Sequence, residues 1–536
     1  MAAPGGSERG HFEDLQAAVR GVYTPTRGLA LAAIVMSSFL LLIGTSWRAS
    51  PDSALYLELG ESLASGKGYV FNEEPHTYVP PGYPALIAVV AWLRPSFLGY
   101  RILMALMGIC TAAAGYYLVK RLLGRDTALL VGGVFAVNHV LLCHSATTTS
   151  DVPFAFVVLL SLHALVGASA GAASLAAVCL AGIMCGLPAL VRINGWGIPA
   201  AGAIFLFSSW RQRDTRARCT LTVLFLFAAI VPGMLWELHK LSLPQSLSEG
   251  TYFNAVFGRS LATLVTIMLD ASWEYASEMT FALTGLSIKT GVVELLVPMV
   301  AAIGALVAFK RGERLFVPLV AIQMSGLILS PAGSRYLIAL LPGLYLFLGV
   351  GIVKISGWLG KRTGKRPPGW TQPRKIVIAF FSVLIFVNAA HNVIPILEAR
   401  RAVQSGGAET IRDVPFFKAA SWLKNNAPHA VVLSMHPRVL HYLSGSKTVE
   451  LVRSGVPEHE VWVNRTAEVR RLIQRTEPAF LFSDASNSTM LASVRDALHS
   501  LGLELVEVSE ASNSRFQLWR IVPSANDPST RYRGTH

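Results

Sequence analysis

Four charged side chains stand beside apolar runs in this 536-residue chain, and their types suit a group-transfer reaction. Asp52 lies in SPDSALYLELGESLASG, and Asp151 ends the stretch HSATTTSD, directly before VPFAFVVLL. Arg192 in ALVRING and Arg335 in PAGSRYL are single cations in otherwise uncharged surroundings. A carboxylate can accept the proton of an attacking hydroxyl, while guanidinium groups stabilise a departing phosphate. The four residues therefore predict transfer from a phosphate-linked donor.

Each of the four also has a simpler structural explanation. Asp52 and Asp151 both precede a predicted helix, where an aspartate commonly caps the first turn. Arg192 and Arg335 could lie along the end of a membrane span and place the guanidinium group at the interface. A capping carboxylate can still be catalytic, so the sequence leaves both interpretations open.

The histidines provide weaker candidates for a metal site. The chain has no HxH or HxxxH spacing, and His139 and His163 fall within apolar runs, where packing or a neutral hydrogen bond is expected. His76 and His144 are predicted on the same side of the membrane as the two aspartates. We therefore keep only His76 and His144 as candidate ligands of a divalent metal ion, should the protein bind one.

The composition is that of an integral membrane protein. Hydrophobic residues make up 52% of the chain and charged residues 15%, and the mean hydropathy is +0.48. The net charge of +14 comes from basic clusters in short loops between apolar runs, which argues against nucleic acid as a partner. The five cysteines lie in or beside apolar runs with no disulfide or metal spacing.

Eleven apolar runs are long enough, or nearly so, to cross a hydrocarbon core of about 30 Å. They are residues 29–47, 102–119, 127–143, 152–170, 172–191, 196–210, 219–236, 292–309, 315–329, 336–353 and 376–390. With the N-terminus inside, the basic loops all become cytoplasmic, as the positive-inside rule requires. These loops are residues 120–125, 211–218, 310–314 and 361–375. The first loop, 48–101, then lies outside, and its apolar run 83–93 is short enough for an interfacial or re-entrant helix.

The tail has lower hydropathy and alternates strand and helix patterns. Residues 430–437, 479–484 and the hairpin-like 504–522 read as strands, while 416–428, 468–475 and 493–502 read as helices. We therefore predict a cytoplasmic segment 1–28, a transmembrane domain 29–395 and a small extracytoplasmic α/β domain 399–536. The tail shows no phosphate-binding loop and no Ser/His/Asp motif, so we expect it to bind or dock.

Ordered motifs over residues 29–355 resemble the GT-C glycosyltransferases. The similarity is to the bacterial branch related to protein mannosyltransferases and to the lipid A aminoarabinose transferase. The first loop carries D-x3-Y (Asp52 and Tyr56), GKGY ending at Tyr69, and PPGYP containing Tyr83. Further along the chain, TTTSDVPFAF, ALVRING and SRYLIALLPGLYLF resemble later motifs of the family.

The resemblance implies an inverting transferase of the plasma (inner) membrane. It would move a sugar from a polyprenyl-phosphate carrier to a hydroxyl of a glycan, lipid or protein at the outer face. Asp52 would be the general base, and Asp151 would orient the acceptor or help to hold a divalent metal. Arg192 and Arg335 would bind the donor phosphate. The pocket would include Tyr56, Tyr69 and Tyr83.

Two departures from the family pattern leave the sugar and the metal unspecified. The first motif has Pro51-Asp52-Ser53 where some relatives have an acidic pair. Before the proline pair stand Tyr78 and Val79, where the aminoarabinose-transferase branch has a glutamate.

Two other classes of protein compete with the transferase interpretation. A secondary transporter would suit eleven spans, but such proteins usually show repeated halves, and we find no internal repeat. A non-catalytic protein that binds or assembles lipid-linked carbohydrate would use the same arginines without needing Asp52.

Overall fold

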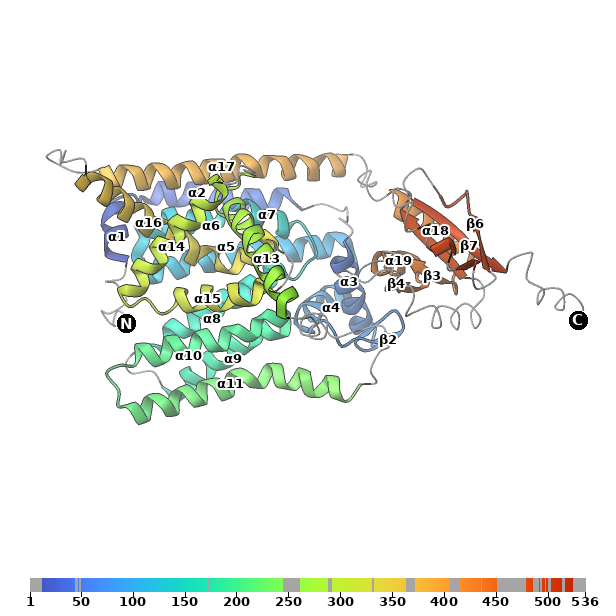
Figure 1. Cartoon of the computed structure of the whole chain (residues 1–536), viewed down its shortest axis with the longest axis horizontal. Helices are drawn as coiled ribbons and strands as arrows, with labels where there is room; N and C mark the ends of the chain where they lie inside the picture. Colours follow the sequence, from blue (N-terminus) through green and yellow to red (C-terminus); the bar gives the residue numbers. More distant parts are fainter. Residues whose placement is uncertain are drawn as a thin grey trace, which may run out of the picture. The chain divides into compact units, whose positions relative to one another are not determined.

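The computed structural model places most of the chain in two units (Figure 1). The residues described are 12–43, 47, 50–170, 174–243, 261–287, 292–329, 332–362, 372–404, 414–434, 436–450, 479–484, 491, 494–496, 498–499, 503–512 and 516–523. The first unit comprises Met1–Thr45, Thr77–Leu86 and Leu93–Ser405, and the second comprises Ser46–His76, Ile87–Trp92 and Gly406–His536. The second unit thus combines part of the first loop with the tail, which the sequence did not predict.

The first unit consists of helices. They are α1 (Glu13–Val19), α2 (Pro25–Leu41), α5 (Phe97–Thr127), α6 (Gly133–Ala136), α7 (His139–Ser145), α8 (Asp151–Ala168), α9 (Leu175–Val191), α10 (Gly197–Ser209), α11 (Thr215–Leu241), α13 (Leu261–Thr284), α14 (Val292–Lys310), α15 (Phe316–Leu327), α16 (Leu341–Arg362) and α17 (Gln372–Gln404). A π-helical turn η2 (Ala128–Gly132) and two 3-10 segments, η3 (Ile193–Trp196) and η4 (Ser334–Leu340), connect some of them. The helix α4 (Gly82–Leu93) has residues in both units.

Each of the eleven apolar runs predicted from the sequence contains helix among its described residues, which confirms a polytopic helical membrane fold. Among the described residues, five helical segments are both long and apolar enough to cross a membrane. They are Phe97–Ala136, Asp151–Ala168, Thr215–Leu241, Ser334–Leu359 and Arg374–Glu398. Shorter apolar helices, including α2, α9 and α15, accompany them. The predicted number of eleven crossings and the predicted orientation stay predictions.

Close helix packing shapes the part of the first unit that leads to the candidate site. The helices α9 and α11 run side by side (Figure 1). A Cβ atom on Gly182 would lie 2.5 Å from the carbonyl oxygen of Phe225, and one on Gly186 would lie 2.2 Å from that of Ala229. Small residues permit this approach of two backbones, which is a common way to pack helices in membranes.

The helix α13 was not predicted. It falls within residues 237–291, which the charge pattern assigns to an outer loop. Its acidic residues Asp270, Glu274 and Glu278 recur every four residues and so share one helix face. These three acidic residues lower the mean hydropathy of the segment. An otherwise apolar helix therefore falls below the hydropathy expected of a membrane span.

The tail forms a five-stranded mixed sheet in the order β4-β3-β5-β7-β6. Its elements are α18 (Val414–Asn426), β3 (Val431–Ser434), α19 (Pro437–Ser444), β4 (Lys447–Glu450), β5 (Ala479–Asp484), β6 (Leu503–Glu507) and β7 (Phe516–Pro523). The strand β3 pairs in parallel with β4 and β5, whereas β7 pairs antiparallel with β5 and β6. The strand at 479–484, the final hairpin and the helix at α18 are confirmed, whereas the strand predicted over 430–437 ends earlier, at Ser434, and α19 begins at Pro437.

Alternate residues of the tail's strands enter two apolar clusters. Val432 and Phe480 pack with residues of α18, while Leu433 and Leu481 join a second cluster with Trp519. This alternation is expected where both faces of a sheet are covered. The predicted helix 468–475 lies outside the described residues, and the described residues between 493 and 502 are helical.

The first loop contributes a helix, α3 (Pro51–Ala64), and a small hairpin to the second unit. Ser50 caps α3, because Ser50 and Ser53 exchange side-chain to backbone hydrogen bonds. The interpretation of Asp52 as the cap is therefore wrong: Asp52 lies in the first turn after the cap. The hairpin pairs β1 (Val70–Phe71) with β2 (Glu74–Pro75) through a two-residue turn, Asn72-Glu73, in which both residues have positive φ.

Candidate functional site

Asp151 and Arg192 form a buried ion pair in the first unit. Asp151 begins α8, its side chain is only 1% exposed, and its Oδ1 accepts a hydrogen bond from Nη1 of Arg192. Arg192 directly follows α9 with an extended backbone, so its side chain leaves the helix end instead of continuing the helical path. The charge-assisted hydrogen bond to this buried carboxylate holds the guanidinium group of Arg192 in one position.

Arg335 and Arg192 share one aromatic ring. Nη2 of Arg335 donates to the hydroxyl of Tyr336 at 2.9 Å. The guanidinium carbon of Arg335 lies 4.9 Å from the centre of the Tyr336 ring, and that of Arg192 lies 4.8 Å from it. Two guanidinium groups are thus gathered at one ring, and Arg192 is also paired with Asp151. The result is a cationic site suited to a phosphate.

The helix α13 supports the loop that carries Arg335. The carboxylate of Glu278 accepts a hydrogen bond from the backbone N–H of Ser334 at 2.6 Å. A hydrogen bond to a charged acceptor is stronger than one between neutral groups, so it holds the start of η4 firmly. Neither Glu278 nor Tyr336 was predicted as a site residue: Glu278 lies in the segment assigned to an outer loop, and Tyr336 follows Arg335 in SRYL but carries no charge.

The stretch from the end of α7 to the start of α8 contains buried polar atoms without hydrogen-bond partners among the described residues. They are Nδ1 of His144, Oγ1 of Thr148 and Oδ2 of Asp151. Buried polar groups are almost always satisfied, so three such atoms in one short stretch indicate a place for a ligand or water. Burial lowers the pKa of His144, and the nearby Arg335 and Arg192 lower it further, whereas Asp151 opposes them. His144 is therefore a neutral hydrogen-bonding group near pH 7.

The PPGYP motif of the first loop packs against the helix end that carries Arg192. A Cβ atom on Gly82 would lie 2.6 Å from the carbonyl oxygen of Leu190, closer than real Cβ contacts come. The turn that follows Arg192 is equally tight, because a Cβ atom on Gly195 would lie 2.3 Å from the carbonyl carbon of Pro188. Glycine at both positions lets the backbone surround Arg192 closely.

Asp52 belongs to the second unit. Its side chain is 40% exposed, and Oδ1 lies 3.5 Å from Nη1 of Arg438 in α19. Tyr56, one helical turn later, is buried. Tyr69 is half-buried and lies edge-on to His76, with ring centres 5.9 Å apart.

Tyr83 lies in the first unit and is fully buried. Its hydroxyl donates a hydrogen bond to Sδ of Met104 at 3.2 Å, within the packed interior of this unit. The structure thus brings together Asp151, Arg192 and Arg335, and it places Asp52, Tyr56, Tyr69 and His76 in the other unit.

The residues proposed for a metal do not fit one. Within the part of the chain that the structure describes, no three His, Cys, Asp or Glu side chains gather in a way that could hold a metal ion. Asp151 is paired with Arg192, and both arginines would repel a divalent cation there. His76 is buried between the rings of Tyr69 and Phe71. We derive no step through a metal.

Comparison with known proteins identifies the fold. Residues 78–236 match the family model described as dolichyl-phosphate-mannose-protein mannosyltransferase. The structure is similar to that of ArnT from Cupriavidus metallidurans bound to undecaprenyl phosphate, with 14% sequence identity and a TM-score of 0.53 over 93% of this chain and 98% of that one. The chain has the GT-C glycosyltransferase fold. No curated protein sequence matches it.

A second GT-C structure shows a similar likeness. AglB, the archaeal oligosaccharyltransferase from Archaeoglobus fulgidus, in complex with an inhibitory peptide and a dolichol-phosphate, shares 12% identity and a TM-score of 0.51 over 93% of this chain and 74% of that one. The oligosaccharyltransferase of that organism has also been crystallised with zinc and sulfate. The resemblance noted in the sequence is thereby confirmed, and the expected enzyme class, a GT-C type glycosyltransferase, agrees with the family model and the fold.

Proposed function

We propose that the chain is an inverting glycosyltransferase that moves a sugar from a polyprenyl-phosphate donor to an acceptor hydroxyl. The reaction would take place at the outer face of the plasma (inner) membrane, with the N-terminus cytoplasmic and the tail outside. The observation that carries the proposal is the pair of arginines, Arg192 and Arg335, gathered at Tyr336, with Arg192 held by the buried carboxylate of Asp151. The similar structures that hold undecaprenyl phosphate or dolichol-phosphate support this choice of donor.

The arginine pair would bind the donor phosphate. Guanidinium groups match the oxygens of a phosphate in bidentate fashion. The two guanidinium groups at Tyr336 would attract an anion. Asp151 would then act mainly by orienting Arg192, and the unpartnered atoms of His144 and Thr148 would provide further hydrogen bonds to the ligand.

Asp52 would act as the general base. Its exposed carboxylate would accept the proton of the acceptor hydroxyl while the hydroxyl oxygen bonds to the anomeric carbon of the sugar. The bond between that carbon and the phosphate oxygen would break, and polyprenyl phosphate would leave with the electron pair. A single displacement of this kind inverts the anomeric configuration and needs no enzyme nucleophile. Of the three tyrosines proposed for the pocket, Tyr69 is the most accessible.

The test is release of polyprenyl phosphate from polyprenyl-phosphate sugars by the full chain in proteoliposomes. Asp52→Asn should lower kcat by about 10²- to 10⁴-fold, the usual contribution of a general base, without changing donor affinity. Asp270→Asn, on an exposed position of α13, is the matched control and should leave kcat unchanged. Undiminished turnover in Asp52→Asn would refute the assignment of the base. If the unaltered protein bound the donor but released no polyprenyl phosphate, a non-catalytic binding protein would be favoured.

A further inference from the structure

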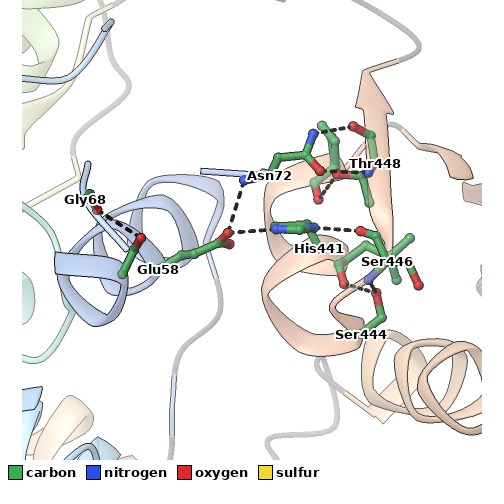
Figure 2. Close-up of polar contacts among 10 residues, drawn as sticks. Glu58, Gly68, Asn72, His441, Ser444, Ser446 and Thr448 are labelled. Atoms are coloured by element: carbon green, nitrogen blue, oxygen red, sulfur yellow. Dashed lines mark hydrogen bonds and ion pairs between the residues drawn. The ribbon is translucent and has the colours of Figure 1, made fainter. Parts of the chain in front are cut away.

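A charged hydrogen-bond chain joins the first loop to the tail within the second unit (Figure 2). Oε1 of Glu58 in α3 accepts a hydrogen bond from the backbone N–H of Asn72 at 3.1 Å and lies 2.7 Å from Nε2 of His441 in α19. Nδ1 of the same histidine lies 2.6 Å from the carbonyl oxygen of Ser446. Residues nearly 400 positions apart are thus linked through one imidazole ring.

This arrangement requires His441 to carry a positive charge. A neutral imidazole has one N–H group and one acceptor nitrogen, yet both ring nitrogens of His441 face acceptors, a carboxylate and a carbonyl. Only the imidazolium form donates to both. Burial alone would lower the pKa of His441, but the hydrogen bond and charge of Glu58, the carbonyl of Ser446 and the charge of Glu73 together raise it.

Further polar contacts near the histidine come from α3, the β1–β2 hairpin and β4. The side-chain amide of Asn72 donates to the carbonyl of Thr448 at 2.8 Å and accepts from its N–H at 3.0 Å, which satisfies the free edge of β4 (Figure 2). The hydroxyl of Tyr442 donates to Glu61 of α3 at 3.0 Å, and Lys447 lies 3.5 Å from Glu74 of the hairpin. The first-loop side therefore supplies four carboxylates around this contact. They are Glu58, Glu61, Glu73 and Glu74.

The helix α19 also contributes the cation that lies next to Asp52. Arg438 precedes His441 by three residues, so the two side chains share one face of α19. We propose that protonated His441 is a latch that fixes α19 to α3 and so positions Arg438 next to Asp52. The significance of Asp52 rests on the proposed function, whereas the latch itself does not.

Because His441 must be protonated, the strength of the latch depends on pH in one direction. Because the pKa of His441 is raised in the folded protein, its contribution is fully present below its ordinary value of about 6.5. That contribution is lost as the pH rises through the raised value. The latch should therefore hold at mildly acidic pH and loosen at alkaline pH.

Hydrogen–deuterium exchange of the full chain in lipid nanodiscs tests the latch between pH 6 and pH 9. After correction for intrinsic rates, we expect protection of residues 50–76 and 437–450 to fall on alkalinisation by about tenfold for each unit of raised pKa. His441→Gln, which keeps hydrogen-bonding groups but no charge, should exchange faster at pH 6 and lose this pH dependence. His429→Gln, at an exposed position of the tail, is the matched control and should behave like the unaltered protein.

The strands β5 and β7 report whether the variant is folded, and their protection should not change. If they stay protected and His441→Gln keeps the pH profile of the unaltered protein, the latch is refuted. If they lose protection, Glu58→Gln replaces His441→Gln as the test, since it removes the charged partner from α3 and leaves the tail sequence intact. It should abolish the pH dependence as well, and a retained profile in that variant would also overturn the proposal.

Transfer assays test the positioning of Arg438 separately. We expect Arg438→Met to lower kcat at least fivefold with little change in KM, and Arg438→Lys to restore most of the rate, while exchange at the latch stays unaltered. Equal rates in all three proteins would refute the role of Arg438. A pH-dependent latch in a protein whose Asp52→Asn variant is fully active would instead contradict the proposed function alone.

Discussion

Replacing Arg192 by glutamine separates its two proposed roles, holding Asp151 and binding an anion. The side chain of Asp151 is 1% exposed and that of Arg192 is 19% exposed. Removing one partner of a buried ion pair costs about 3–5 kcal/mol, because the other charge is left stranded. If Asp151 instead took up a proton, the cost at pH 7 would be about 4 kcal/mol for a carboxyl group with the ordinary pKa of aspartic acid. We therefore expect Arg192→Gln to lower the free energy of unfolding by about 4 kcal/mol.

Arg335→Gln is the matched comparison. It removes a hydrogen bond and a cation–π contact with Tyr336 while Asp151 keeps its ion pair with Arg192, so it should cost only about 1 kcal/mol. Both variants should bind polyprenyl phosphate at least tenfold more weakly. Chemical unfolding in nanodiscs, followed by tryptophan fluorescence, measures the stabilities. Adding Asp151→Asn to Arg192→Gln should recover most of the lost stability but not the lost affinity. Equal stability of the two single variants would refute the reasoning.

Three further perturbations test the supports of the site and of the latch. Gly82→Ala would press a methyl group against the Leu190 carbonyl and should cost about 1–3 kcal/mol, with weaker polyprenyl phosphate binding in a filter assay. Glu278→Gln should weaken that binding severalfold at nearly unchanged stability, and unchanged affinity would exclude a supporting role for α13. Asn72→Gly keeps a residue that tolerates positive φ but removes both side-chain hydrogen bonds to Thr448. Hydrogen–deuterium exchange of the β4 amides should therefore become about tenfold faster, which corresponds to about 1.4 kcal/mol.

The sequence predicts much of the helical fold because apolar length and loop charge are local signals. Each apolar run has a helix, and α3 ends where the glycines Gly66 and Gly68 adopt positive φ. The helix α13 was missed because its three acids lower the average hydropathy, although their four-residue spacing was a signal of a helix. The strands β3 and β5 could be predicted because each is short, apolar and bounded by polar residues, whereas the polar strand β4 was not predicted.

The candidate site could be predicted only in part. The motifs single out Asp151, Arg192 and Arg335, and the structure brings these three together. Their shared neighbour Tyr336 and the support from Glu278 depend on tertiary packing, which no local pattern encodes. His441 had no signal at all, since an isolated histidine acquires its charge only from partners that are distant in sequence. The proposed domain boundaries 1–28, 29–395 and 399–536 stay predictions.

The proposed function requires that the chain consume a polyprenyl-phosphate sugar with Asp52 as the base. Mass spectrometry of the lipid-linked sugars in the native host tests it most directly, because neither the sugar nor the acceptor has to be known beforehand. Cells that lack the protein, or carry only Asp52→Asn, should accumulate one polyprenyl-phosphate sugar that cells with the unaltered protein use up. Identical amounts of every polyprenyl-phosphate sugar in all three would contradict the account.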